Sequence, residues 1–131
     1  MKIMVCYEGS GASQAALRIA VKHAKAFGAK LILVASLERR NKDEQNKVVQ
    51  KLEQELKNAK DKIASEGLEC DTHLLVRGIS PDEDLVTYAK EQSIDEIAIG
   101  IRKRSKVGKL IFGSTAQYLI LNAHCPVVTV K

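Results

Sequence analysis

Apolar residues along this chain form two kinds of pattern, short unbroken runs and positions spaced three or four residues apart. The unbroken runs predict strands at residues 2–7, 31–36, 71–76, 94–99 and 126–130. The run at residues 31–36 does not alternate with polar residues. Such a run is typical of a strand that is covered on both faces in a parallel sheet.

The spaced apolar positions predict four helices that alternate with these strands. The second is a long amphipathic helix over residues 41–66. Ser80 followed by Pro81 marks the start of the third, because Ser caps helices and Pro is favoured at the first helical position. Ser114 with Gln117 predicts a capping box at the start of the fourth.

The alternation of strands and helices predicts an α/β fold, an open parallel sheet with helices on both faces. Five strands fit the doubly wound, flavodoxin-like order 3-2-1-4-5, and the length fits a single domain over residues 1–131. In such sheets ligands bind beyond the carboxyl ends of the strands, where the strand order reverses. We expect that crevice between the first and fourth strands, with walls at residues 6–10 and from Gly100 onward.

The net charge of +5 is concentrated near the end of the chain. The first 96 residues contain 15 basic and 16 acidic residues, whereas no acidic residue follows Glu96. Five of the six basic residues beyond Glu96 lie at residues 102–109. This asymmetry predicts either an anionic partner near residues 102–109 or a solvated basic loop, and charge alone does not choose between them.

Membrane insertion and a disulfide framework are both disfavoured by the sequence. No apolar run approaches the roughly 20 residues that span a bilayer, and the first residues do not form a secretory signal, so a cytoplasmic location is expected. The three cysteines and three histidines are widely separated, without the spacing of a zinc site. We therefore predict no metal site, and we expect the thiols of Cys6, Cys70 and Cys125 to be buried or inert.

Two common nucleotide motifs fail on this sequence. The phosphate-binding loop G-x-x-x-x-G-K-[ST] ends on Leu110 instead of a hydroxyl residue, and G-x-G-x-x-G is incomplete after the first strand. The segment Gly113-Ser114-Thr115 places a glycine before a predicted helix. Free N–H groups at a helix start attract anions, and glycine lets an anion come close to the backbone. The segment predicts either a phosphate-binding turn or an ordinary capped helix.

Over its whole length the chain resembles the universal stress protein (UspA-like) family. The resemblance is carried, in this order, by IMVCYEGSGAS, VRGISPDED, DEIAIG, GKLIFGSTAQYLI and AHCPVVTVK. It implies the five-stranded fold and, in many members, ATP bound in the crevice through the pattern G-x2-G-x9-G-[ST]. It places Glu8, Ser36, Gly100, Lys103, Gly113, Ser114 and Thr115 at nucleotide-binding positions, and we predict Tyr7, Ile99 and Arg102 as further nucleotide-binding residues beside them.

Two of these positions depart from the family pattern. Lys103 stands where the pattern has its second glycine; a lysine there could replace backbone N–H donors by a point charge, or it could fill the site. Glu8 is one methylene longer than the Asp that the family usually has near the adenosine end of the nucleotide. Ser36 occupies a position that lines the adenine pocket in binding members.

The preferred hypothesis is a stress-response regulatory protein that binds an adenine nucleotide of the ATP type. Mg²⁺ would bridge phosphate oxygens, and the nucleotide would switch binding to an unidentified protein partner. No general base with a positioned partner is recognisable, so no catalytic residue is assigned and at most slow ATP hydrolysis is expected. The alternative is a family member that binds no nucleotide and acts as a dimeric protein-interaction module. Nucleic-acid binding is disfavoured, because a basic patch alone gives weak, salt-sensitive affinity.

The last predicted strand is expected to lie at an edge of the sheet, where an unprotected apolar strand invites pairing with another chain. The resemblance implies the same, because family members commonly pair through this strand. We therefore expect a homodimer formed through Val127, Val128, Thr129 and Val130. The alternative is an edge strand that Lys131 and the chain end protect.

Overall fold

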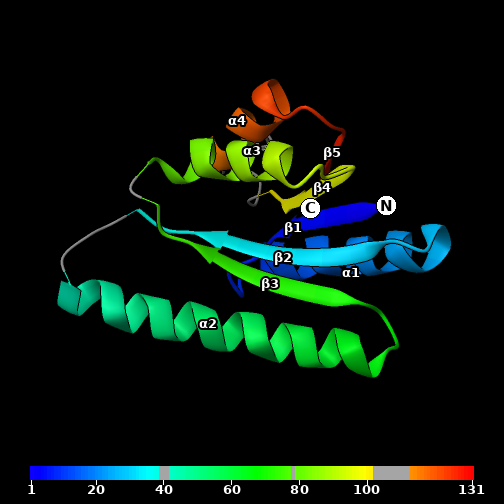
Figure 1. The fold of residues 1–131 in the computed structure, drawn as a ribbon, viewed down its shortest axis with the longest axis horizontal. Helices are drawn as coiled ribbons and strands as arrows, with labels where there is room; N and C mark the ends of the chain where they lie inside the picture. The colour runs from blue at the N-terminus through cyan, green and yellow to red at the C-terminus, as the bar shows by residue number, and fades with distance from the viewer. Residues whose placement is uncertain (39–41, 78, 102–112) are drawn as a thin grey trace, which may run out of the picture.

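The computed structural model describes residues 1–38, 42–77, 79–101 and 113–131. Within these ranges, strands and helices alternate along the chain (Figure 1). The strands are β1 (Lys2–Cys6), β2 (Lys30–Ser36), β3 (Cys70–Leu75), β4 (Glu96–Gly100) and β5 (Val127–Val130). The helices are α1 (Gly11–Phe27), α2 (Lys42–Ser65), α3 (Pro81–Glu91) and α4 (Ser114–Asn122). The predicted ends of the strands agree with these bounds to within two residues.

The strands form one parallel sheet in the order β3-β2-β1-β4-β5. The predicted fold class is therefore confirmed in both strand order and strand direction. β1 is central: its Ile3 pairs with Leu31 of β2 on one side and with Glu96 of β4 on the other. The chain passes from one half of the sheet to the other beside β1, so the crevice of this fold lies at the carboxyl ends of β1 and β4.

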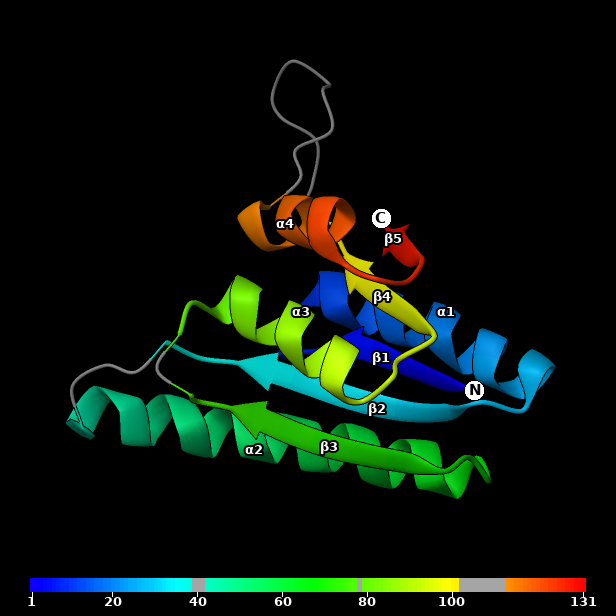
Figure 2. The ribbon, with the colours of Figure 1, turned by 45° about the horizontal axis from the view of Figure 1, so that its top comes forward.

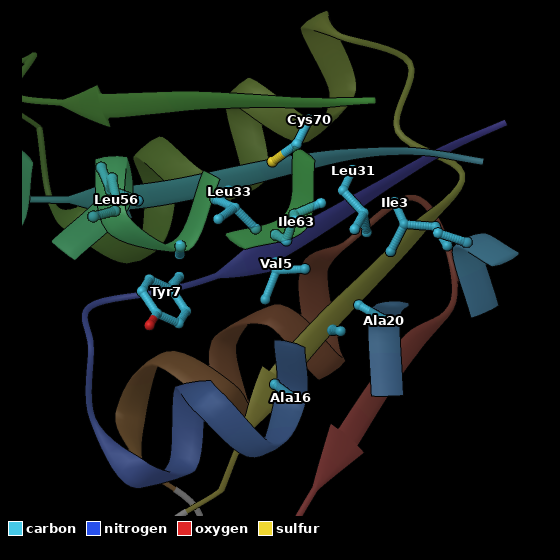
Figure 3. Packing of buried hydrophobic residues seen from close by; sticks show 14 of the residues in the cluster. Ile3, Val5, Tyr7, Ala16, Ala20, Leu31, Leu33, Leu56, Ile63 and Cys70 are labelled. Carbon is cyan, nitrogen blue, oxygen red and sulfur yellow. The ribbon is translucent and has the colours of Figure 1, made fainter. Parts of the chain in front are cut away.

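Two hydrophobic cores cover the two faces of the sheet. On one face, Ile3 and Val5 of β1 pack with the buried sides of α1 and α2, as Figure 3 shows. On the other face, Met4 and Cys6 pack with α3 and α4, and Figure 2 shows these two helices lying together over the sheet. Successive side chains of a strand point to opposite faces, so a strand covered on both sides must be apolar throughout.

Among the described helix ends, two follow clear local sequence signals and one departs from the predicted signal. Gly28 ends α1 in the left-handed conformation at φ 66°, and the Ser80 side chain caps α3. The predicted capping box at Ser114 is wrong: the N-cap of α4 is Gly113, which makes no side-chain cap hydrogen bond. The helix begins one residue early because the N–H of Gln117 donates to the carbonyl of Gly113, at 3.1 Å. Among the described residues, no helix combines the length and apolar character needed to cross a membrane.

Candidate functional site

A cavity of about 690 Å³ opens at the carboxyl ends of β1, β2 and β4, where the strand order reverses. Its volume suits a small organic ligand. Eight of the ten predicted site residues line it: Tyr7, Glu8, Ser36, Ile99, Gly100, Gly113, Ser114 and Thr115. The other two, Arg102 and Lys103, lie outside the described residues.

The start of α4 forms one wall of the cavity and is suited to an anion. Gly113, the N-cap residue, has an extended backbone (φ −64°, ψ 160°) and offers no side chain to the first turn. Ser114 and Thr115 line the cavity, and the first turn of α4, which is described in full, carries no acidic residue. Its free N–H groups and the helix dipole therefore favour a negatively charged group such as phosphate.

The starts of α1 and α3 are already capped by serine side chains of the protein itself. The Ser10 hydroxyl oxygen accepts from the N–H of Ser13 at 3.2 Å, before α1. The Ser80 hydroxyl oxygen accepts from the N–H of Glu83 at 3.3 Å, and α3 also carries three acidic residues in its first turn. Among α1, α3 and α4, whose starts are described in full, α4 is the helix without a side-chain cap. An anion in the cavity is therefore directed to α4.

The Glu8 side chain lies on the β1–α1 loop and is exposed. Its carboxylate atom Oε1 accepts a hydrogen bond from the Ser10 hydroxyl, which itself accepts from the N–H of Ser13. Glu8 is thereby tied to the cap of α1, where a helix dipole favours a negative charge. Oε2 is left to accept a hydrogen bond from a donor in the cavity.

Tyr7 lies between the first hydrophobic core and the cavity, and only 6% of it is exposed. Burial raises the pKa of its phenol, and the charges of Glu55 and Glu8 raise it further. The phenol is therefore a neutral hydrogen-bonding group near pH 7. Glu55 also joins α2 to the loop: a Cβ atom on Gly9, at φ 90°, would stand 2.8 Å from the Glu55 carboxyl carbon.

Ser36 ends β2 with an unsatisfied polar atom. Its Oγ atom is buried and has no hydrogen-bond partner among the described residues, although Ser36 lines the cavity. Leaving a buried hydroxyl unpaired costs free energy, and such groups in folded proteins generally have a partner. A polar atom of a ligand in the cavity would supply that partner.

Gly100 ends β4 at a close contact with the start of α1. A Cβ atom at this position would lie 2.1 Å from the carbonyl oxygen of Ala12, far inside contact distance. The resemblance predicts Gly100 as part of a nucleotide site, and the structure adds a packing requirement for glycine there. Because Ile99, Gly100 and Ala12 all line the cavity, the same contact fixes the position of its wall.

The sequence reasoning missed the part of the wall that α2 and α3 supply. These residues are Val48, Lys51, Leu52, Pro81 and Leu85. The periodicity of α2 marked its buried side but not the residues that face the strand ends. Topology offered a signal, because the helix that follows a strand in a parallel sheet begins at the carboxyl edge, where ligands bind.

The residues that were predicted to form a dimer interface belong to β5, which lies at the edge of the sheet as expected. Thr129 is exposed, and the valines at 127, 128 and 130 are half-buried. The dimer that these residues were expected to form stays a prediction.

The described residues do not supply a metal centre or a reactive thiol in the cavity. No group of three or more His, Cys, Asp or Glu side chains in the described ranges could hold a metal ion. Cys6 lines the cavity, but burial, with a smaller effect of Glu8, raises the pKa of its thiol to about 12. Cys6 is therefore protonated near neutral pH and a poor nucleophile.

Comparison with known proteins agrees with the observed fold. The model of the "Universal stress protein family" matches residues 1–131. A universal stress protein of Thermus aquaticus is 29% identical over 134 residues, covering 98% of this chain and 97% of the relative. The structure of a universal stress protein from Archaeoglobus fulgidus is 37% identical, with a TM-score of 0.87 and coverage of 99% and 97%. A structure described as the Archaeoglobus fulgidus universal stress protein in complex with dAMP is 34% identical, with a TM-score of 0.81 and coverage of 99% and 96%.

Proposed function

Because the chain belongs to the universal stress protein family, we propose that it binds an adenine nucleotide in the cavity beyond β1 and β4. Some structures of the family contain such a nucleotide, among them the dAMP complex from Archaeoglobus fulgidus. One observation carries the proposal: the uncapped start of α4 and Ser36, whose buried hydroxyl has no partner among the described residues, line the same cavity. In an adenine nucleotide, the phosphate could bind at the start of α4 and a polar ring atom of the adenine could pair with the Ser36 hydroxyl.

The phosphate is proposed to lie at the start of α4. The N–H groups after Gly113 and the hydroxyls of Ser114 and Thr115 are donors, and phosphate oxygens are acceptors. Arg102 and Lys103, which lie outside the described residues, remain a sequence-based prediction as further phosphate ligands.

The adenine is proposed to lie at the end of β2, on the far side of β1 from α4. The cavity wall there combines the hydroxyl of Ser36 with the apolar side chains of Val34, Leu37 and Leu52. An apolar slot with one or two polar groups is the usual form of a site for a flat heterocycle. The phenol of Tyr7 and the carboxylate of Glu8 lie along the β1–α1 loop between the two ends of the proposed ligand.

We propose ATP as the physiological nucleotide, with Mg²⁺ on its phosphate oxygens. The described lining carries one carboxylate, Glu8, which is too few for a Mg²⁺ site made by protein alone. The residues present therefore fit a metal that arrives with the phosphates. When bound, Mg²⁺ would neutralise phosphate charge, while the residues at the start of α4 hold the phosphates in place.

The proposed regulatory role is a nucleotide-dependent switch in the binding of a protein partner during stress. We further propose that residues 1–131 act as one domain, in the cytoplasm. A ligand can shift a protein between two states only by binding one of them more tightly. The switch therefore requires that a partner bind the nucleotide-loaded and nucleotide-free proteins with different affinities.

Calorimetry on nucleotide-stripped protein tests the proposal, with ATP and Mg²⁺, ADP and AMP titrated in turn. Saturable binding is expected, and Gly113→Val should weaken it by roughly tenfold or more, because a branched side chain crowds the phosphate. The backbone angles of Gly113 suit any residue. Gly11→Val is the matched control, since Gly11 starts α1 and a Cβ atom there would meet nothing within 4 Å. No binding at millimolar nucleotide, by a protein with normal circular dichroism, would overturn the proposal.

The second candidate function is a dimeric interaction module, and the edge position of β5 favours it. The carbonyl of Pro126 accepts a hydrogen bond from the N–H of Ile97 in β4, and the carbonyl of Val130 accepts one from the N–H of Ile101, just after β4. Backbone groups alternate in direction along a strand, so those of Thr129 point to the open edge. We propose that two copies pair there. Sedimentation should show a dimer that Thr129→Pro reduces to a monomer, and a monomeric parent protein would contradict this.

A further inference from the structure

We infer that Lys51 of α2 is a specificity-determining residue that recognises the sugar of the bound nucleotide, an inference that rests on the proposed function. Lys51 and Glu8 are the charged side chains among the described residues that line the cavity. The ammonium group of Lys51 donates hydrogen bonds, and the carboxylate of Glu8 accepts them. A ribose hydroxyl can donate and accept at once, so the pair matches the chemistry of a ribose.

Contacts of α2 with the β1–α1 loop place Lys51 near Glu8. Glu55 lies against Gly9, close enough that a Cβ atom on Gly9 would stand 2.8 Å from the Glu55 carboxyl carbon. Lys51 precedes Glu55 by four residues and so lies on the same side of α2, one turn away. That turn is nearer to the start of α2, which lies toward the carboxyl ends of the strands in Figure 1. Lys51, which lines the cavity, therefore lies on the side of α2 that faces the β1–α1 loop, and that loop carries Glu8.

The backbone of Lys51 is fixed, whereas its ammonium group is available. The next residue, Leu52, is 8% exposed, and Leu56 one turn later is 3% exposed, so the buried side of α2 anchors this part of the helix in the core. Among the described residues, Lys51 has no salt bridge or hydrogen bond. Lys30 differs, since its ammonium group lies 2.6 Å from the carboxylate of Asp71.

The position of α2 favours the sugar over the phosphate as the partner of Lys51. α2 packs with α1 on one face of the sheet, whereas α4 packs with α3 on the other face. The phosphate is assigned to the start of α4, so Lys51 approaches the ligand from the opposite wall. Between the two walls runs the β1–α1 loop with Glu8, where the sugar of a nucleotide would lie.

The inference is tested by comparing AMP with dAMP, which lacks the 2′-hydroxyl. Calorimetry would measure both ligands on the parent protein, on Lys51→Met and on Lys47→Met. Lys47 is the matched control, because it is exposed one turn earlier on α2 and does not line the cavity. Both variants lose one positive charge, so any effect of overall charge is shared. Circular dichroism would verify that the variants keep the parent fold.

The parent protein should bind AMP roughly tenfold more tightly than dAMP, the usual size of a hydrogen bond to a charged group. Lys51→Met should lower the affinity for AMP by about that factor and leave the affinity for dAMP nearly unchanged. Lys47→Met should keep the preference for AMP over dAMP. Equal weakening of AMP and dAMP by Lys51→Met would overturn the inference and assign Lys51 to the phosphate or base. An unchanged preference in Lys51→Met would also overturn it. If the parent protein binds neither AMP nor dAMP but binds ATP, the inference is overturned and the proposed function stands; if ATP also fails to bind, both are overturned.

Discussion

Gly100 at the end of β4 touches the first turn of α1 so closely that a Cβ atom would lie 2.1 Å from the carbonyl oxygen of Ala12. The contact joins two elements that are far apart in the sequence. It also sets the distance between two walls of the cavity, because both residues line it. Glycine at this position therefore serves the packing of the site whether or not a ligand is bound.

Gly100→Ala should destabilise the protein by at least about 2 kcal/mol, because the added methyl group forces β4 and α1 apart. Chemical denaturation of the variant measures this change. Gly11→Ala is the matched control: Gly11 starts α1, and a Cβ atom there meets nothing within 4 Å. If the two substitutions cost the same free energy of unfolding, the close contact does not constrain the fold.

Ser36→Ala should affect stability and binding in opposite directions. The hydroxyl has no partner among the described residues, so its removal should leave the free energy of unfolding unchanged or higher. Nucleotide affinity should fall by roughly two- to tenfold as a hydrogen bond is lost. Thermal unfolding and calorimetry of the same variant measure both effects.

Ser13→Ala provides the contrast for this prediction. Ser13 is 2% exposed, and its hydroxyl donates to the carbonyl of Ser10 at 2.9 Å. Its removal should cost about 1 kcal/mol of stability, the usual value of such a bond. A Ser36→Ala variant that loses as much stability as Ser13→Ala would show that Ser36 is satisfied within the protein.

The carboxylate of Asp84 is fully buried and depends on Arg77, whose Nε atom donates to it at 2.5 Å. Arg77→Met should therefore cost roughly 3 kcal/mol, because it leaves a buried charge unpaired. The double variant Arg77→Met with Asp84→Leu should recover much of this loss. Glu91→Gln, which removes only the exposed second partner of Arg77 at 3.4 Å, should cost little. Urea denaturation of the four proteins checks the order, and an unrecovered double variant would contradict it.

The buried thiols should make stability fall at alkaline pH. Burial raises the pKa of Cys6 from 9.0 to about 12 and that of Cys70 from 9.0 to about 11. Above pH 9 the unfolded chain releases these protons while the folded protein keeps them, so unfolding becomes easier as pH rises toward 11 or 12. This contribution is absent below pH 9, where both states hold the protons.

The measurement is the free energy of unfolding at a series of pH values from about 8 to about 10.5. The double variant Cys6→Ala with Cys70→Ala should show a shallower fall than the parent protein, whatever its stability at the starting pH. Equal slopes in the two proteins would show that the thiols titrate alike in the folded and unfolded states. Iodoacetamide should also modify the folded parent protein far more slowly than the unfolded chain.

Local patterns in the sequence were sufficient to predict the elements and their order. The apolar run at residues 31–36 predicted a strand covered on both faces, and β2 is buried between two helical layers. The cap of α4 was predicted wrongly, because a Ser-x-x-Gln spacing also occurs when the serine is the first helical residue. The difference matters for the site, since a glycine cap leaves the N–H groups of the first turn to a ligand.

The sequence by itself determined the α/β fold, the crevice beyond β1 and β4, and the glycine that precedes α4, where an anion could bind. It could do so because hydrophobic periodicity and turn residues act over a few neighbouring positions. Only the tertiary structure decided that Lys51 of α2 lines the cavity, that the Ser36 hydroxyl lacks a partner among the described residues, and that Gly100 packs against Ala12. These facts depend on how closely and at what angle distant elements pack, and no local pattern records a packing distance.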